Sequence, residues 1–233
     1  NATTIKESDM PIKQALNKEF KITGSNKKPQ ILIYHTHSME DFSNTTKDED
    51  TTIIGVGNRL AQILREQFGY NVIHDKTKYD IVNGKLDRHE AYTQSKAGVK
   101  KQLKKYPSIS LILDIHRDGV NDGTRLVTEI NGKKTAQIMF FNGMSRFKLS
   151  GDIDYLKNPY RFENLALGLQ MKVNAECYYP GFTRRNYVNA YEYNLSLGKQ
   201  CMLIEVGAQT NTYQEAKNAA EPLAVLIKKV LGE

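Results

Sequence analysis

Histidine and glutamate side chains stand where three apolar stretches of this sequence end. The first stretch leads into His35 and His37, with Glu40 three residues later; the second leads into His116, and the third contains Glu205. Zinc in a hydrolytic site takes three protein ligands, typically histidines and a carboxylate, and leaves one position for water. A further carboxylate then serves as general base for that water and as acid for a leaving amine. These residue types are therefore suited to zinc-dependent hydrolysis of an amide bond.

Each of these residues also has a structural explanation. A single histidine at the end of a strand is usually a hydrogen-bonded structural residue, but two such ends, one of them a His-x-His pair near a glutamate, favour a metal site. Glu205 interrupts an apolar run, where an unpaired charge is costly, and its alternative role is an ion pair with Arg117. His74 also ends a strand and His89 lies in a predicted helix, and both are expected at the surface.

The elements that must position these residues alternate between strands and helices. Four short apolar runs are typical of buried parallel strands. They span residues 30–34, 71–74, 109–115 and 201–206. Four segments carry apolar residues at helical spacing. They span residues 54–68, 88–106, 160–175 and 211–231.

This alternation predicts a single α/β domain, with a mostly parallel, twisted sheet and helices on both faces. Ligands of such sheets bind beyond the carboxyl ends of the strands, so residues distant in sequence can meet there. Asn131-Gly132 separates the strand-like runs 125–130 and 135–141, and this dipeptide predicts a β-hairpin insertion with a type I′ turn. The polar segment 177–198 is expected to lie at the surface around the site.

Composition and net charge limit the classes of protein and of partner that remain. Hydrophobic residues make up 39% and charged residues 25%, as in ordinary globular domains, and the formal net charge is +7. The lysine pairs are scattered and not interleaved with aromatics, which argues against nucleic acid. The basic charge is either a solvated surface or a surface for an anionic polymer such as the cell wall. Cys177 and Cys201 fit no metal or redox pattern.

Residues 1–28 are polar and lack sustained periodicity, so they are expected to be a lead-in to a catalytic domain over residues 29–233. The chain begins with Asn1 rather than methionine, and we expect a processed or shortened form whose targeting segment is missing.

Four motifs together are more specific than any one of them. They are Ile31-Leu32-Ile33-Tyr34-His35-Thr36-His37 with Glu40, Asp114-Ile115-His116-Arg117-Asp118, Tyr193-Asn194-Leu195-Ser196, and Leu203-Ile204-Glu205-Val206-Gly207 with Asn211. In these motifs the chain resembles the stage II sporulation protein P family, within the class of zinc-dependent N-acetylmuramoyl-L-alanine amidases. The resemblance covers nearly the whole chain from about residue 29.

The resemblance implies a set of metal ligands. In the amidase class a histidine at the end of the first strand, a glutamate and a second histidine bind zinc, and they correspond here to His37, Glu40 and His116. His35 remains an alternative to His37, and Glu49 is the rival of Glu40.

The resemblance also assigns the residues around the metal. The class's catalytic glutamate corresponds to Glu205, in agreement with its place in the last strand. His35, Arg117 and Asn194 are expected to contact substrate or to orient the ligands. Where the class has a small polar residue after its third ligand, this chain has Arg117-Asp118, so the class's substrate contacts do not transfer directly.

The implied function is a peptidoglycan hydrolase that cleaves the amide bond between N-acetylmuramic acid and L-alanine of the stem peptide, with endopeptidase activity on crosslinks associated with the sporulation branch. The resemblance further implies an N-terminal membrane anchor outside these residues, an extracytoplasmic position at the sporulation septum during engulfment, and cooperation with the sporulation protein D transglycosylase and sporulation protein M. Two alternatives stay open: a non-catalytic glycan- or partner-binding module with an amidase-like fold, and a zinc deacetylase or peptidase acting on other amides.

Overall fold

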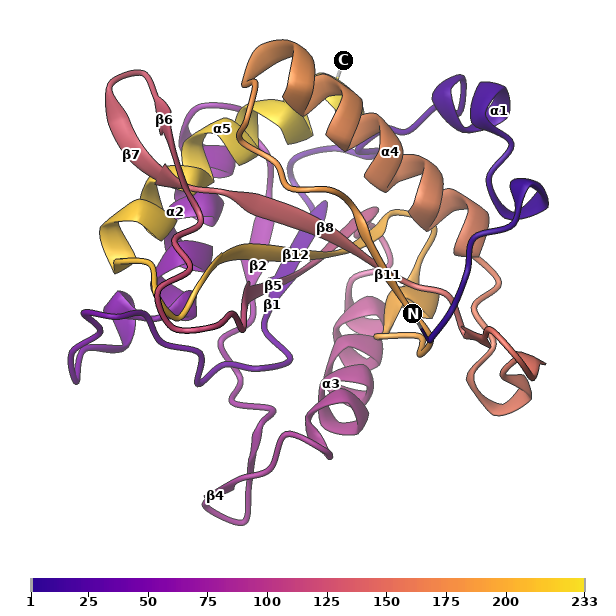
Figure 1. Cartoon of the computed structure of the whole chain (residues 1–233), viewed down its shortest axis with the longest axis horizontal. Coiled ribbons are helices and arrows are strands. Elements are labelled where there is room, and N and C mark those ends of the chain that lie inside the picture. The colour runs from indigo at the N-terminus through magenta and orange to yellow at the C-terminus, as the bar shows by residue number, and fades with distance from the viewer. Residues whose placement is uncertain (1, 233) are drawn as a thin grey trace.

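A six-stranded sheet forms the centre of the protein, whose computed structural model describes residues 2–232 (Figure 1). Its strands lie in the order β11-β8-β12-β5-β1-β2. They are β1 (Ile31–Tyr34), β2 (Val72–His74), β5 (Leu111–Asp118), β8 (Ile138–Gly143), β11 (Tyr187–Asn189) and β12 (Cys201–Ala208). The neighbours β2, β1, β5 and β12 are parallel, whereas β8 pairs with β12 in the antiparallel sense.

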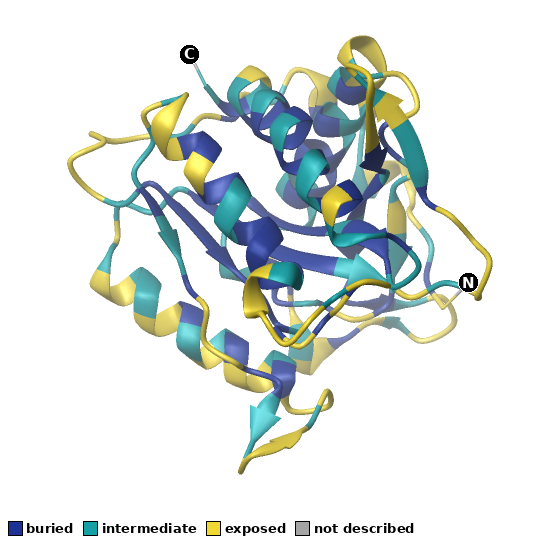
Figure 2. Ribbon diagram, turned by 90° about the vertical axis from the view of Figure 1, so that its left-hand side faces the viewer, coloured by how far each residue is buried: buried dark blue, intermediate teal, exposed yellow. Residues whose placement is uncertain are grey.

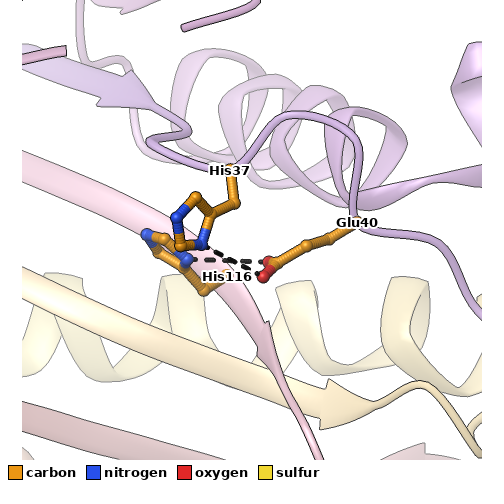
Figure 3. Close-up of side chains that lie close together, drawn as sticks. All are labelled: His37, Glu40 and His116. Atoms are coloured by element: carbon orange, nitrogen blue, oxygen red, sulfur yellow. Dashed lines mark ion pairs between the residues drawn. The ribbon is translucent and has the colours of Figure 1, made fainter. Parts of the chain in front are cut away.

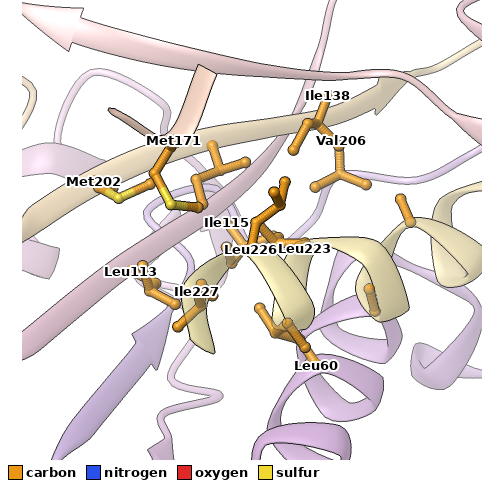
Figure 4. Close-up of a cluster of buried hydrophobic side chains, with 14 of the residues drawn as sticks. Leu60, Leu113, Ile115, Ile138, Met171, Met202, Val206, Leu223, Leu226 and Ile227 are labelled. Carbon is orange, nitrogen blue, oxygen red and sulfur yellow. The ribbon is translucent and has the colours of Figure 1, made fainter. Parts of the chain in front are cut away.

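Helices cover both faces of this sheet, which confirms the predicted fold class. They are α1 (Ile12–Leu16), α2 (Ile53–Glu66), α3 (Ala91–Lys105), α4 (Arg161–Tyr178) and α5 (Tyr213–Leu231). Side chains of α2, α4 and α5 share one buried cluster with the sheet, part of which is drawn in Figure 4. α3 lies on the opposite face, where Val99 packs against Leu32 and Leu203. The four central strands, β8, β12, β5 and β1, are almost wholly buried between these layers (Figure 2).

Alternation along the strands decides which layer each side chain meets, because successive side chains of a strand point to opposite faces. In β5, Leu113 and Ile115 belong to the cluster under α2 and α5, whereas Ile112 belongs to the cluster under α3. Asp114 and His116 are two and four residues beyond Ile112, so they point toward α3. The polar residues of this strand therefore gather on the α3 side of the sheet.

The chain changes direction across the sheet between β1 and β5. From β1 it passes through α2 to β2 on one side, and from β2 it passes through α3 to β5 on the other side of β1. In open α/β sheets the carboxyl ends of the two strands at such a reversal form the crevice that binds ligands. The residues that follow β1 and end β5 therefore lie at the expected place for a site.

Two strands run further than their apolar residues suggest. β5 continues to Asp118 and β12 to Ala208, so His116 lies within its strand rather than beyond the end, while Glu205 lies within β12 as predicted. The backbone of both strands stays paired: Glu205 is in register with His116. This pairing, and not an apolar pattern, extends the strands and places the two side chains next to each other.

The predicted hairpin is confirmed at its turn and wrong in its second arm. β6 (Val127–Ile130) pairs with β7 (Lys133–Ala136), and Asn131 and Gly132 both have positive φ, as a type I′ turn requires. The second arm stops at Ala136, and the following apolar residues form β8 of the central sheet. Two-stranded pairs also form between β3 (Ile81–Val82) and β4 (Lys85–Leu86) and between β9 (Arg146–Phe147) and β10 (Gly151–Asp152).

The N-terminal segment is packed against the rest of the protein. Ala15 of α1 is fully buried, and the Gln170 side chain of α4 donates to its carbonyl oxygen at 2.8 Å. Asp9 forms an ion pair with Arg146 at 2.5 Å, with both side chains largely buried. The division of the chain at residue 28 stays a prediction. Among residues 2–232, no helix has the length and apolar character needed to cross a bilayer.

α2 approaches the ends of β1 and β2 at Gly57. A Cβ atom at this position would lie 2.6 Å from Nε2 of His74 and 2.7 Å from Nε2 of His35. Only glycine leaves room for this contact, so Gly57 sets the distance between helix and sheet.

We therefore expect Gly57→Ala to lower the free energy of unfolding. In an ordinary helix interior this change stabilises by about 1 kcal/mol, but overpacking of a full site costs about 1–3 kcal/mol. Urea unfolding measures the difference. Gly119→Ala is the control, because a Cβ there meets no atom within 4 Å. A Gly57→Ala protein as stable as the parent would contradict the close packing.

Candidate metal centre

His37, Glu40 and His116 offer ligand atoms that all lie within 4.8 Å of one another (Figure 3). The Nδ1 atom of His37 is 3.5 Å from Oε1 of Glu40, and Nδ1 of His116 is 3.6 Å from Oε2. The two imidazole rings meet edge to face with centroids 5.1 Å apart. Glu40 and His116 are buried, and His37 is half-buried. The structure thus brings together two histidines separated by most of a βαβαβ unit.

The turn after β1 carries two of these residues and is fixed at several points. The carboxylate of Asp80 accepts hydrogen bonds from Oγ of Ser38 at 2.5 Å and from the backbone N–H of Met39 at 3.0 Å. The carbonyl oxygen of Glu40 accepts from the N–H of Ile53 at 3.0 Å, at the first residue of α2. Its carboxylate accepts from the N–H of Arg117 at 2.8 Å. The Glu40 side chain therefore points at the end of β5.

Opposite charges dominate the electrostatics of this cluster. Burial disfavours the ionised form of Glu40, but the charge of His116 and the hydrogen bonds from both histidines and the Arg117 N–H hold the Glu40 pKa well below its usual range. Burial likewise opposes protonation of His116, yet the carboxylates of Asp114 and Glu40 raise the His116 pKa well above its ordinary value. A positive charge between these carboxylates is therefore strongly favoured.

Two buried polar atoms at this place have neither a hydrogen bond nor an ion-pair contact: Nε2 of His37 and Oε2 of Glu205. Leaving such atoms unsatisfied costs about 1–3 kcal/mol each, so their gathering in one place calls for a ligand. Two imidazoles and one carboxylate form a donor set that suits zinc, with space for water as a further ligand. The residues present therefore fit a zinc ion.

Glu205 lies beside the cluster on β12, level with His116. Burial raises the pKa of the Glu205 carboxyl to about 8, against a smaller opposing effect of the His116 charge. Its contacts do not include the ion pair with Arg117 that the sequence leaves open, because the Arg117 guanidinium lies 3.5 Å from the carboxylate of Asp41. A largely buried carboxyl with a pKa near neutrality has the properties of a general base and acid.

His35 points away from the cluster. It is one residue beyond Tyr34, and the alternation of the strand turns it to the α2 side, where its Nε2 lies 2.8 Å from Nε2 of His74. Its Nδ1 donates to the carbonyl oxygen of Ile115 at 2.7 Å, and burial lowers the His35 pKa to about 4. His74 is thus a partner of His35. Glu49 is also distant from the cluster: it is exposed and pairs with Lys78 at 2.8 Å.

A chain of hydrogen bonds links His116 to the segment before β12. Nε2 of His116 is 2.9 Å from Oδ1 of Asp114, an ion-pair contact without the alignment of a hydrogen bond. Oδ2 of Asp114 accepts from the Thr36 hydroxyl at 2.6 Å. The Thr36 hydroxyl lies 3.0 Å from Oγ of Ser95, which accepts from the side-chain amide of Asn194 at 2.9 Å. These five residues are buried.

The direction of this chain follows from proton counting. Thr36 gives its only hydroxyl proton to Asp114, so it can only accept from Ser95, whose single hydroxyl proton is shared between Thr36 and the carbonyl oxygen of Tyr92 at 3.3 Å. Asn194 is therefore part of the support of the cluster. Asp114 has a recognisable sequence signal, because it is a charged residue inside the most apolar strand. The role of Ser95 has none, because one serine in a polar helix is not distinctive.

Tyr92 of α3 is a further residue of the centre that the sequence pattern does not indicate. Its ring packs edge to face on His37 with centroids 5.5 Å apart, and Tyr193 packs on Tyr92 at the same distance. The two tyrosines fix the orientation of the His37 ring from the side opposite Glu40.

Comparison with known proteins gives the family. The family described as stage II sporulation protein P matches residues 1–228, which confirms the resemblance noted in the sequence. The stage II sporulation protein P of Bacillus subtilis (strain 168) is 27% identical over 213 residues, covering 84% of this chain and 50% of that protein. The chain thus spans about half the length of this relative.

Solved structures share the fold at low sequence identity. The N-acetylmuramoyl-L-alanine amidase AmiC2 of Nostoc punctiforme is 16% identical with a TM-score of 0.51, over 88% of this chain and 98% of that one. The CwlD amidase from Clostridioides difficile, solved in complex with the GerS lipoprotein, is 16% identical with a TM-score of 0.51, over 86% and 97%. These matches show an amidase-like fold.

The hydrogen-bonded support predicts that Thr36→Val destabilises the protein. Valine keeps the shape but removes the hydroxyl, so the buried carboxylate of Asp114 loses a donor, at a cost of about 1–3 kcal/mol. Thr93→Val on the exposed side of α3 is the control, expected within about 0.5 kcal/mol of the parent. Equal free energies of unfolding for the two variants would show that the chain contributes nothing.

Proposed function

Because the chain belongs to the stage II sporulation protein P family, we propose that it is a peptidoglycan hydrolase, a zinc-dependent amidase that cleaves the bond between N-acetylmuramic acid and L-alanine of the stem peptide. The observation that carries this proposal is the buried His37–Glu40–His116 cluster with Glu205 beside it. AmiC2 of Nostoc punctiforme, which shares the fold, supports it, since its name states this reaction.

The proposed ligands are His37, Glu40 and His116. When bound there, zinc lowers the pKa of water toward ~7 and polarises a carbonyl group. Asp114 holds the His116 ring in place, as carboxylates commonly do for histidine ligands, and so keeps its Nδ1 turned toward Glu40. Tyr92 does the same for His37.

Glu205 moves the proton in this proposal. Its free Oε2 accepts a proton from the attacking water. The same oxygen then donates that proton to the amide nitrogen while the carbon–nitrogen bond breaks. A carboxyl that titrates near neutrality can do both, because neither transfer is strongly uphill.

The wider biology is proposed from the family alone. We infer action at the sporulation septum, anchoring by a segment outside these residues, and cooperation with the sporulation protein D transglycosylase and protein M. Endopeptidase activity on crosslinks stays a prediction of the same kind. A binding module without turnover is the other function class, and no contact at the cluster favours it over hydrolysis.

Separate effects are expected for metal and proton transfer. His116→Ala should lose both bound zinc and activity, whereas Glu205→Gln should keep zinc and lose at least about 100-fold in rate, the usual contribution of a general base. Purified sacculi with and without chelator serve as substrate, mass spectrometry identifies the bond cut, and elemental analysis counts zinc. Glu129→Gln, at an exposed position, is the control. Unchanged digestion by Glu205→Gln would remove the role given to Glu205.

The raised Glu205 pKa predicts a pH-dependent stability of the metal-free protein. The folded value of about 8 exceeds the ordinary 4.5, so ionising the carboxyl opposes folding. This cost is absent below the ordinary value, grows as pH rises, and is complete above about 8, at roughly 1.4 kcal/mol for each pH unit between the two values. Chelator-treated Glu205→Gln should therefore match the parent near pH 4.5 and be more stable at about pH 8.5 in urea unfolding. Equal stability at the higher pH would contradict the raised pKa.

A further inference from the structure

A groove of about 780 Å³ runs along the outer side of α3, between this helix and the segment before β12. The helix contributes residues of one face, namely Tyr92, Thr93, Lys96 and Lys100, and Arg88 and His89 line the groove just before the helix begins. Tyr191, Tyr193 and Leu156 line the opposite wall. The proposed ligands and Glu205 do not line this groove, whereas Tyr92, Tyr193 and Asn194, which support the cluster, do.

The groove adjoins the metal centre through Tyr92. Tyr92, in its wall, packs on His37, Tyr193 packs on Tyr92, and Tyr191 follows with its ring centroid 6.4 Å from that of Tyr193. Phe147 packs on Tyr191 at 5.5 Å and ends the row. A continuous line of aromatic rings therefore leads from a proposed ligand out along the groove.

The wall opposite α3 is held in a fixed shape. Tyr193 and Asn194 have φ angles of 52° and 58°, a conformation that costs non-glycine residues of order 1–3 kcal/mol. The Asn194 side chain donates to the Tyr92 carbonyl oxygen at 3.1 Å and to Ser95 at 2.9 Å, which offsets this strain. Such a preorganised wall loses little entropy when a ligand binds.

The groove carries unpaired positive charge. Lys96 is neutralised, because its Nζ lies 2.8 Å from both carboxylate oxygens of Glu192. Arg88 and Lys100 are exposed, and neither has an ion pair or a side-chain hydrogen bond within residues 2–232. Because Lys96 is paired with Glu192, Arg88 and Lys100 are the two cations that remain unpaired at the rim of the groove within residues 2–232. An occupant with carboxylates would complement them.

We propose that this groove binds the acidic stem peptide of the substrate, and this inference rests on the function proposed above. A stem peptide carries carboxylates for Arg88 and Lys100, and its alanine methyl groups and peptide planes suit the tyrosine wall. The glycan with its amidated lactyl group is uncharged and leaves both cations unused. The occupant thus enters beside His37, which places the first amide of the peptide at the metal centre.

The test is a binding measurement that does not depend on turnover. The zinc-loaded Glu205→Gln chain is titrated calorimetrically with N-acetyl-L-alanyl-γ-D-glutamyl-diaminopimelate, with the same peptide after amidation of its carboxylates, and with a lactyl-amidated N-acetylglucosaminyl–N-acetylmuramyl disaccharide. The acidic peptide should bind, and the amidated peptide and the disaccharide should bind at least about tenfold more weakly, since two ion pairs at the rim are lost.

Paired double variants locate the binding. Arg88→Gln with Lys100→Gln should lower the affinity for the acidic peptide about tenfold. Lys101→Gln with Lys104→Gln removes the same charge from other exposed positions of α3 and should leave the affinity unchanged. Equal affinities of the two double variants, or tighter binding of the disaccharide, would overturn the proposal. Cleavage of sacculi by the wild-type protein tests the hydrolase function separately. If the protein cleaves sacculi but the two double variants have equal affinities, only the groove proposal is wrong. If the peptide binds as expected but sacculi are not cleaved, only the hydrolase proposal is wrong.

Discussion

Burial of carboxylates at one end of the sheet is the constraint on which this structure depends. Glu40, Asp114 and Glu205 are each largely or wholly buried within reach of one imidazole, that of His116. Buried charges persist only when they are paired or bind a metal. Without a metal, a protonated His116 compensates one negative charge; with zinc bound, His116 would be neutral and the divalent cation would compensate two. A zinc ion would therefore compensate these buried negative charges better than the protonated histidine alone.

Much of the fold follows from simple patterns, and so does the position of the site. The four parallel strands and their helices come from apolar runs and helical spacing, and parallel strand ends share an edge. To decide whether His35 or His37 faces the cluster, one must also know where β1 ends, because the alternation of side chains stops there. β1 ends at Tyr34; His35 still follows the alternation and faces α2, while His37 lies in the turn beyond it, where the alternation no longer holds.

Other parts depend on contacts between distant segments and leave no local signal. In the sequence, the end of β7 and the start of β8 form one strand-like run, residues 135–141. Only the pairing of β8 with β12 and of β7 with β6 separates them. Glu40 and Glu49 lie in the same polar loop. What selects Glu40 is the Asp80 carboxylate, which holds the turn at Ser38 and Met39. The chain from Asn194 to Asp114 joins four segments, and no spacing in the sequence reveals it.

One side of α3 faces the candidate metal centre and the other lines the proposed peptide groove. Ser95, on the inner side, completes the hydrogen bonds that fix Asp114 and so His116. Tyr92 touches His37 directly, and Lys100 stands on the outer side. Because these residues belong to one rigid helix, an occupant pressed against the outer side bears on the two histidine ligands together. A peptide in the groove would therefore hold the helix in the position that the metal centre requires, which couples correct substrate placement to correct ligand geometry.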